Sequence, residues 1–298
     1  MTIRSRSTRV AAGTLATLAL AVPAASARNY EPAERFAATV GDQEVLVFST
    51  DGRARHVWLR GLGEHEAIVG LDVRPATGVL YAATDADRIY TIDLDARRAT
   101  PVGSAFAPGL LGEFAGFDFN PAVDRIRLTS DANENLRLVP DTAALAAVDG
   151  PLAYAATDAS AGIDPSVVGS AYTNPDTDPA TPTTLYGIEA ATDALVVQNP
   201  PNAGTLNTVG KLGVDARYTV GFDIAPGNTG WAVMRPRGER RTGLYRIDLA
   251  TGAARRSLSF GTLSILGRVL SFGTHTEIGA LAVLGGGSKY GKAARHGH

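Results

Sequence analysis

A short pattern that begins with glycine occurs five times along the chain, and it limits the possible folds more than any other feature. The pattern is Gly, apolar, Asp, apolar, any residue, Pro, and it is complete in GLDVRP (70–75), GFDFNP (116–121) and GFDIAP (221–226). Weaker versions occur in VVGSAYTNP (167–175) and EIGALAVL (277–284). The first glycines lie 46, 53, 52 and 58 residues apart, at positions 70, 116, 169, 221 and 279. A fixed period of this size indicates a protein built from repeated units.

A second repeated pattern lies between the copies of the first. LYRIDLATGAARRS (244–257) matches IYTIDLDARRATPV (89–102) and LYGIEAATDALVVQ (185–198), and looser copies cover 45–58 and 135–148. Each copy is an alternating apolar run, a turn rich in Asp, Thr, Gly or Ala, and a second short run. This combination predicts two strands joined by a hairpin.

Other short strands are expected between the two patterns, at VLYAAT (79–84), DRIRLTS (124–130) and GWAVMR (230–235). Proline ends the first strand of a unit, because it cannot donate a hydrogen bond to a strand ladder. Four short antiparallel strands in a unit of this length are typical of a β-propeller blade. We therefore predict an all-β propeller of five four-stranded blades. Six blades, or a pair of β-sandwiches, are the alternatives.

The order of the two patterns predicts how the ring closes. The first repeat copy along the chain is of the second pattern, near Val45, and the last copy is of the first pattern, near Gly279. Five copies of each then give four complete blades and one split blade. In the split blade, N-terminal strands would pair with the C-terminal strand, which removes the exposed sheet edge.

The repeated aspartates are the main candidates for a site. Alternation in GFDF puts Phe117 and Phe119 on one face and Asp118 on the other, toward the central channel or a backbone partner. The third and fifth units lack the acid. We expect a structural role, in which each carboxylate accepts hydrogen bonds from strand amides and joins blade to blade. A broken ring of carboxylates that binds calcium is the alternative. The expected channel-lining residues are Asp72, Asp118, Tyr172 and Asp223.

Other segments give weaker signals. SDANEN (130–135) matches the start of a calcium loop, but Leu136 stands where the turn requires glycine, so a polar hairpin turn is favoured. NPPNAGTL (199–206) predicts a loop that is either a connection or a binding segment. No catalytic motif is present, so the catalytic residues stay unknown, and no cofactor is expected apart from possible calcium.

Composition narrows the function further. The chain contains no cysteine, which excludes disulfides, thiolate nucleophiles and cysteine-bound metals. The formal net charge is −2 and no basic cluster stands out, which argues against nucleic acid as a partner. No apolar run approaches the length of a membrane span.

The two ends are expected to lie outside the propeller, which we place at residues 28–284. Residues 1–27 have a basic start, a short apolar run and a small-x-small cleavage site ending at Ala27, which together predict a secretory signal peptide. The tail, residues 285–298, is rich in glycine and basic, and we expect it to be disordered. The mature protein is therefore predicted in the periplasm or outside the cell.

Three stretches together resemble a bacterial exported family known as a domain of unknown function, DUF4394. They are GFDFNPAVDRIRL followed by SDANENLRL, TTLYGIEAATDALVVQNPPNAGTLNTVGKLGVD (183–215), and GFDI with LYRIDLATG. The resemblance covers roughly residues 35–284, and the QNPPN-x-GTL stretch is its most specific part. Glu189 stands where the family usually has Asp. The resemblance implies export and a repeat-built β fold, and it implies no activity, cofactor or catalytic residue.

These observations predict a non-catalytic binding or structural module, with a protein, glycan or small molecule as partner, that acts as a monomer. The alternative is a metal-assisted hydrolase or lactonase that uses carboxylates at the channel mouth. Propellers host such chemistry, but a fold does not imply a function.

Overall fold

The computed structural model describes residues 33–113, 115–178, 180–217, 221–239, 241–260, 264–265, 268–269 and 278–285. The expected signal peptide and residues 286–298 of the expected tail lie outside these ranges. In the described part, no helix is long and apolar enough to cross a membrane.

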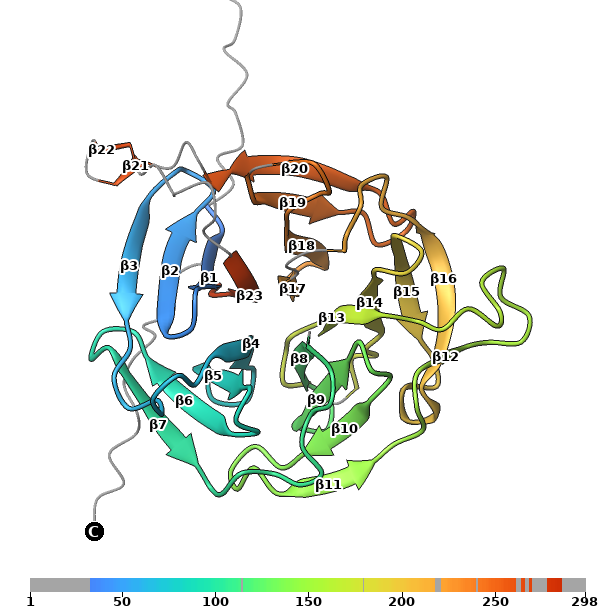
Figure 1. Ribbon diagram of the computed structural model, residues 1–298, viewed down its shortest axis with the longest axis horizontal. Helices are drawn as coiled ribbons and strands as arrows, with labels where there is room; N and C mark the ends of the chain where they lie inside the picture. Colours follow the sequence, from blue (N-terminus) through green and yellow to red (C-terminus); the bar gives the residue numbers. More distant parts are fainter. Residues whose placement is uncertain are drawn as a thin grey trace, which may run out of the picture. The chain divides into compact units, whose positions relative to one another are not determined.

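Five sheets of four antiparallel strands stand around a common centre (Figure 1). Blade 1 is β23 (Ile278–Val283), β1 (Arg35–Val40), β2 (Glu44–Ser49) and β3 (Ala54–Trp58). Blade 2 is β4 (Ile68–Arg74), β5 (Val79–Thr84), β6 (Ile89–Asp93) and β7 (Arg98–Val102). Blade 3 is β8 (Ala115–Asn120), β9 (Arg125–Ser130), β10 (Asn135–Leu138) and β11 (Leu145–Val148). The first strand named in each blade is the innermost.

Blade 4 is β13 (Val167–Tyr172), β14 (Leu185–Glu189), β15 (Ala194–Gln198) and β16 (Thr205–Lys211). Its outer edge carries β12 (Ala153–Tyr154), which pairs parallel to β16. Blade 5 is β17 (Gly221–Ala225), β18 (Thr229–Met234), β19 (Gly243–Ile247) and β20 (Ala254–Ser259). A separate hairpin is formed by β21 (Ser264–Ile265) and β22 (Arg268–Val269). The predicted five-bladed β-propeller is therefore confirmed, over six blades and over a pair of sandwiches.

Blade 1 is the split blade. Its innermost strand, β23, comes from the end of the described chain, and its other three strands come from the beginning. Strands β1 and β23 are antiparallel, with Phe36 opposite Val283 and Val40 opposite Ile278. The ring thus closes as the order of the two repeats predicts, and strand pairing holds the two ends together.

The repeated pattern explains the innermost strands. Strands β4, β8 and β17 end at Arg74, Asn120 and Ala225, each directly before the proline of its repeat. Glycine at the start of a repeat allows neighbouring blades to approach closely at the centre. A Cβ on Gly70 would lie 2.4 Å from Cβ of Phe117, and one on Gly221 would lie 2.4 Å from the backbone nitrogen of Leu281. A side chain at either position would push two blades apart.

Hydrophobic clusters fill four of the five junctions between blades. They join blade 1 to blade 2, blade 2 to blade 3, blade 4 to blade 5 and blade 5 to blade 1. Phe117 and Phe119 lie in the cluster between blades 2 and 3, as the alternation predicts. Among the described residues, no such cluster has members from both blade 3 and blade 4. That junction is built differently.

Blade 4 departs from the repeat order expected from the sequence. LYGIEAATDALVVQ forms its second and third strands, β14 and β15, whereas the matching segments in blades 2 and 5 form the third and fourth. The fourth strand of the blade, β16, includes Thr205 and Leu206, which the sequence assigned to a loop. The physical reason is that an alternating run and a hairpin turn fit any pair of adjacent strands. The pattern therefore does not specify which two strands of the blade the segment forms.

Candidate functional site

The junction between blades 3 and 4 is polar because of side-chain alternation in two strands. In β9, Arg125 and Arg127 lie on one face, and the apolar Ile126 and Leu128 lie on the other. Arg137 of β10 is the cross-strand partner of Arg127, so it shares the arginine face. The apolar face packs against blade 2, which leaves the three arginines facing blade 4.

Arg127 is the central group of this junction. Its side chain is only 2% exposed, although arginine is rarely buried without partners. Nη1 donates to Oδ1 of Asn135 and to Oδ2 of Asp149, both at 2.6 Å, and Nη2 donates to Oδ1 of Asn202 at 2.8 Å. Nε donates to the hydroxyl of Tyr172, at 3.4 Å. Arg127 thus binds groups from both blades.

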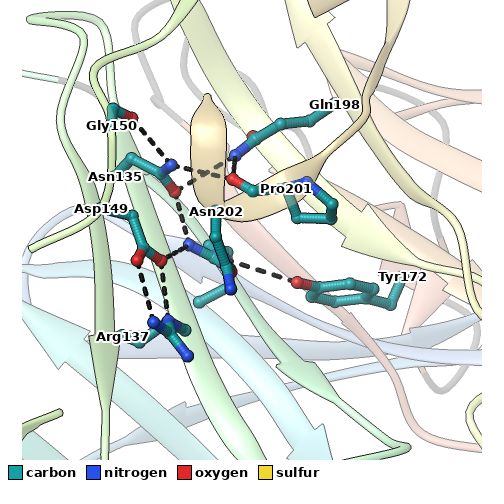
Figure 2. A network of polar contacts seen from close by, with 9 residues as sticks. Asn135, Arg137, Asp149, Gly150, Tyr172, Gln198, Pro201 and Asn202 are labelled. Carbon is teal, nitrogen blue, oxygen red and sulfur yellow. Dashed lines mark hydrogen bonds and ion pairs between the residues drawn. The ribbon is translucent and has the colours of Figure 1, made fainter. Parts of the chain in front are cut away.

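Asp149 joins two of the arginines. Besides the contact with Arg127, its Oδ2 accepts from Nε of Arg137 at 2.7 Å, and its Oδ1 accepts from Nη2 of Arg137 at 2.9 Å. These hydrogen bonds raise the pKa of Arg137, which therefore keeps its positive charge. One carboxylate is shared by two guanidinium groups and compensates only one of their two charges, so the network keeps an excess of positive charge (Figure 2).

The loop formed by residues 199–202, which we call the NPPN loop, covers the network from the side of blade 4. Pro201–Ala203 form a single turn of 3₁₀-helix, and the carbonyl of Pro201 accepts from Nδ2 of Asn135 at 2.9 Å and from Nε2 of Gln198 at 2.6 Å. The N–H of Gly150 donates to the carbonyl of Asn202 at 3.0 Å. Figure 2 shows the contacts of Pro201 with Asn135 and Gln198, with Tyr172 on one side of the network and Asp149 on the other. The loop is therefore fixed by contacts to blade 3 as well as to its own blade.

A pocket of about 280 Å³ opens beside this network. Its polar lining comes from Arg125, Arg127, Arg137, Asn120, Tyr172 and Asn202. Val123, Pro200 and Pro201 supply the apolar lining, and Ile126 borders the pocket although its side chain packs in the cluster between blades 2 and 3. Small-ligand sites combine an apolar wall with a few convergent polar groups, and this pocket has both.

The three repeated aspartates meet at the centre of the ring. Asp72, Asp118 and Asp223 are buried, and one carboxylate oxygen from each lies within 4.8 Å of the others. Oδ2 of Asp72 accepts from the N–H of Phe119 at 2.8 Å, Oδ1 of Asp118 from that of Tyr172 at 3.2 Å, and Oδ2 of Asp223 from that of Val283 at 2.5 Å. Each carboxylate thus accepts a hydrogen bond from the next blade, as we expected.

Burial opposes ionisation of these carboxyl groups. Burial raises the pKa of Asp223 to about 6. It also raises the pKa of Asp72 and of Asp118 well above the usual value, and the charges of the neighbouring aspartates add to the effect. Three buried carboxylates cannot all be charged without compensation, so either protons or a cation must balance them. Three oxygens would supply only part of the about six to eight ligands that calcium takes.

The SDANEN segment and Tyr172 are the two remaining sequence candidates. SDANEN forms the turn between β9 and β10, in which the N–H of Ala132 donates to Oγ of Ser130 at 3.2 Å. Asn135, which matched a calcium ligand in the sequence, instead bonds Arg127 and the NPPN loop. Tyr172 provides both a backbone N–H to Asp118 and a hydroxyl to the pocket.

The sequence interpretation missed the arginines and Asp149. A signal was present, because RIRL in β9 and NLRL in β10 alternate arginine or asparagine with apolar residues. In an exposed strand such a face is solvated. Only the ring places blade 4 over this face, and only then do the arginines line a pocket.

Fold and pocket define the class of protein: a five-bladed β-propeller with a positively charged pocket between two of its blades. The chain belongs to the family described as Domain of unknown function (DUF4394), which it matches over residues 46–267. The sequence matches none of the functionally curated proteins.

Three solved structures are similar to parts of this chain at low identity. A structural genomics protein of unknown function from Bacteroides thetaiotaomicron has 12% identity and a TM-score of 0.43, with 76% of this chain and 58% of that chain covered. Dihydro-heme d1 dehydrogenase NirN has 15% identity and a TM-score of 0.36, with 83% of this chain and 48% of that chain covered. PorZ, a surface component of the type-IX secretion system of Porphyromonas gingivalis, has 12% identity and a TM-score of 0.36, with 75% of this chain and 28% of that chain covered. The chain therefore spans less than two thirds of each.

Proposed function

We propose that this propeller is a non-catalytic binding module, and that the pocket between blades 3 and 4 holds a small molecule. The single observation that carries the proposal is the polar junction. Four blade junctions are filled by hydrophobic clusters, whereas this one contains three arginines and an open pocket.

Stability alone is a poor explanation for such a junction. Buried ion pairs lose much of their Coulombic attraction to the cost of removing charges from water, and apolar packing is often as stable or more stable. The other junctions of the same ring are packed with apolar side chains. A polar junction with a pocket is therefore better explained by recognition of a ligand.

The central aspartates support a second candidate, a metal-assisted hydrolase. Its basis is the group of three carboxylate oxygens within 4.8 Å of one another. Two features favour the binding module instead. The carboxylates have backbone partners in neighbouring blades, which gives them a role without a metal. The cavity at the centre, lined by the starts of the inner strands, measures only about 10 Å³, which is too small for an organic substrate.

We also propose that the protein acts in the periplasm or outside the cell, on the basis of the signal peptide predicted in residues 1–27. Cell fractionation with mass measurement of the recovered protein checks this. The expected species begins at Arg28, and recovery of the full chain from the cytosol would contradict it.

The binding proposal is tested by amide NMR spectra recorded with a panel of anionic, neutral and cationic small molecules. We expect at least one compound to shift the signals of Tyr172, Arg137 and Asn202 together. The control is a second pocket, lined by Arg246, Asp248 and Arg255 of blade 5. The proposal would be contradicted if no compound shifted the signals of Tyr172, Arg137 and Asn202. It would also be contradicted if every active compound shifted the signals of both pockets alike.

A further inference from the structure

We propose that the pocket recognises the oxyanion of a small organic molecule, a carboxylate or a phosphate monoester, through Arg125, Arg137 and Tyr172. This inference rests on the proposed binding function and adds the chemical class of the ligand. It follows from an account of the hydrogen-bond donors and acceptors that line the pocket.

The acceptors around the pocket are already occupied. Both carboxylate oxygens of Asp149 accept from Arg137, and one of them also accepts from Arg127. Oδ1 of Asn202 accepts from Arg127. The hydroxyl oxygen of Tyr172 accepts from Nε of the same arginine.

Several donors remain available. Among the described residues, no acceptor is bonded to Nη1 of Arg137, to Nε or Nη2 of Arg125, or to Nδ2 of Asn202. The hydroxyl proton of Tyr172 likewise has no acceptor in the described part of the chain, and this side chain is buried. A ligand that satisfies these groups must bring acceptors. Carboxylates and phosphates are rich in acceptors, and guanidinium groups bind them in a two-pronged geometry.

Charge favours the same ligand class. Among the described residues, the lining contains three arginines and no acid. The nearby Asp149 is shared by Arg127 and Arg137, and Asp141, which interacts with Arg125 through its charge, is paired with Arg74. Asp124, next to Arg125 in sequence, is held by Arg74 at 2.5 Å instead. An anion that enters the pocket therefore meets an excess of positive charge, partly screened from water.

Size and shape suggest how the rest of the ligand is held. A pocket of about 280 Å³ lies near the lower end of ligand sites, so the ligand has about the size of one sugar ring or a short organic acid. Val123, Pro200 and Pro201 offer an apolar wall for its carbon skeleton.

The test compares matched pairs of ligands by isothermal titration: glucuronate with glucose, and glucose 6-phosphate with glucose. Within each pair the carbon skeleton is nearly constant and the oxyanion is present or absent. The two anionic members distinguish a carboxylate from a phosphate as the preferred group. Each pair is titrated into the wild-type protein and into Arg125→Gln, Arg137→Gln and Arg246→Gln. Arg246 is the matched control, since it lines the other pocket.

We expect at least one anionic member to bind at least about tenfold more tightly than glucose, and Arg125→Gln and Arg137→Gln each to weaken it about tenfold or more. Arg246→Gln should leave the affinity unchanged. Arg125 has no ion pair in the described residues, so its variant keeps the test valid if Arg137→Gln disturbs the fold.

Equal affinity for glucose and the anions, equal weakening by Arg246→Gln, or no detectable binding of either anion would overturn the oxyanion assignment. If neutral compounds still shift the pocket signals in the NMR panel, the proposed binding function stands and only the oxyanion assignment fails. If no compound in that panel shifts these signals, the binding function and the oxyanion assignment both fail.

Discussion

The hydroxyl of Tyr172 accepts a hydrogen bond from Nε of Arg127 at 3.4 Å, although the two residues belong to neighbouring blades. The backbone N–H of the same tyrosine donates to Asp118 at the centre of the ring. Tyr172 therefore connects the pocket between blades 3 and 4 with the carboxylates that join the inner strands. Changes at the ring centre and in the pocket can be measured separately.

Asp118→Ala should lower the melting temperature with or without calcium. The substitution leaves the buried N–H of Tyr172 without its acceptor, which costs about 1–3 kcal/mol. Asp223→Ala should behave alike, because it removes the acceptor of Val283. Thermal unfolding of both variants with calcium and with a chelator checks this. Variants that melt like wild type once metal is removed would instead indicate a shared metal site.

Stability should fall as the pH rises from about 4 through 6 and above. In the folded protein the pKa of Asp223 is raised to about 6 from 3.8, and those of Asp72 and Asp118 are raised as well. The native state therefore holds protons in this window that the unfolded chain has lost. For each proton that only the native state holds, the free energy of unfolding falls by about 1.4 kcal/mol for every unit by which the pH rises.

Asp118→Asn isolates this effect, because an amide oxygen still accepts from Tyr172 but does not titrate. Urea unfolding between about pH 5 and pH 8 should show a shallower loss of stability in the variant than in the wild type. A constant difference between the two proteins over this range would show that the carboxyl groups are not titrating as we infer.

Gly116→Ala should destabilise the propeller by about 1–3 kcal/mol, since a Cβ there would lie 2.3 Å from Oγ of Ser170 in the next blade. Gly279→Ala is the matched control at the start of another inner strand. Its Cβ would meet a single close atom, Oγ1 of Thr39 at 3.1 Å. Chemical denaturation should rank Gly116→Ala as the more damaging variant, and equal losses would argue against close approach as the reason for the repeated glycine.

Arg127→Met should cost about 1–3 kcal/mol, because Tyr172 and Asn202 each lose the donor that Arg127 provides. The loss is limited because Asp149 keeps its two contacts with Arg137. Arg125→Met should change stability by less than about 0.5 kcal/mol, since this side chain bonds only carbonyls of its own turn. Denaturant titrations check both. A near-neutral Arg127→Met would contradict the assignment of Arg127 as the centre of the junction.

Ending the chain after residue 277 should abolish cooperative unfolding. This truncation removes β23, the innermost strand of blade 1 and the source of the Val283 N–H that Asp223 accepts. Ending it after residue 285 is the control, and we expect the melting temperature to stay within about a degree of wild type. Calorimetry of the two truncations distinguishes closure by the last strand from a general effect of shortening the chain.

The sequence alone determined the architecture of this protein. The Gly-apolar-Asp-apolar-x-Pro repeat, the prolines that end the inner strands and the alternation of apolar residues are local signals, and they were enough to predict five blades and a split closure. The position of each aspartate within its repeat likewise predicted a carboxylate that joins blade to blade.

The position of the pocket depends on how the blades pack around the ring. Arg127 binds Asn135, Asp149 and Asn202, which are 8, 22 and 75 residues away in sequence, and no local pattern links them. Alternation in RIRL shows that the arginines share one face, but it does not say what covers that face. The ring order places the NPPN loop of blade 4 against it, and the packing of two particular blades turns a row of arginines into a pocket.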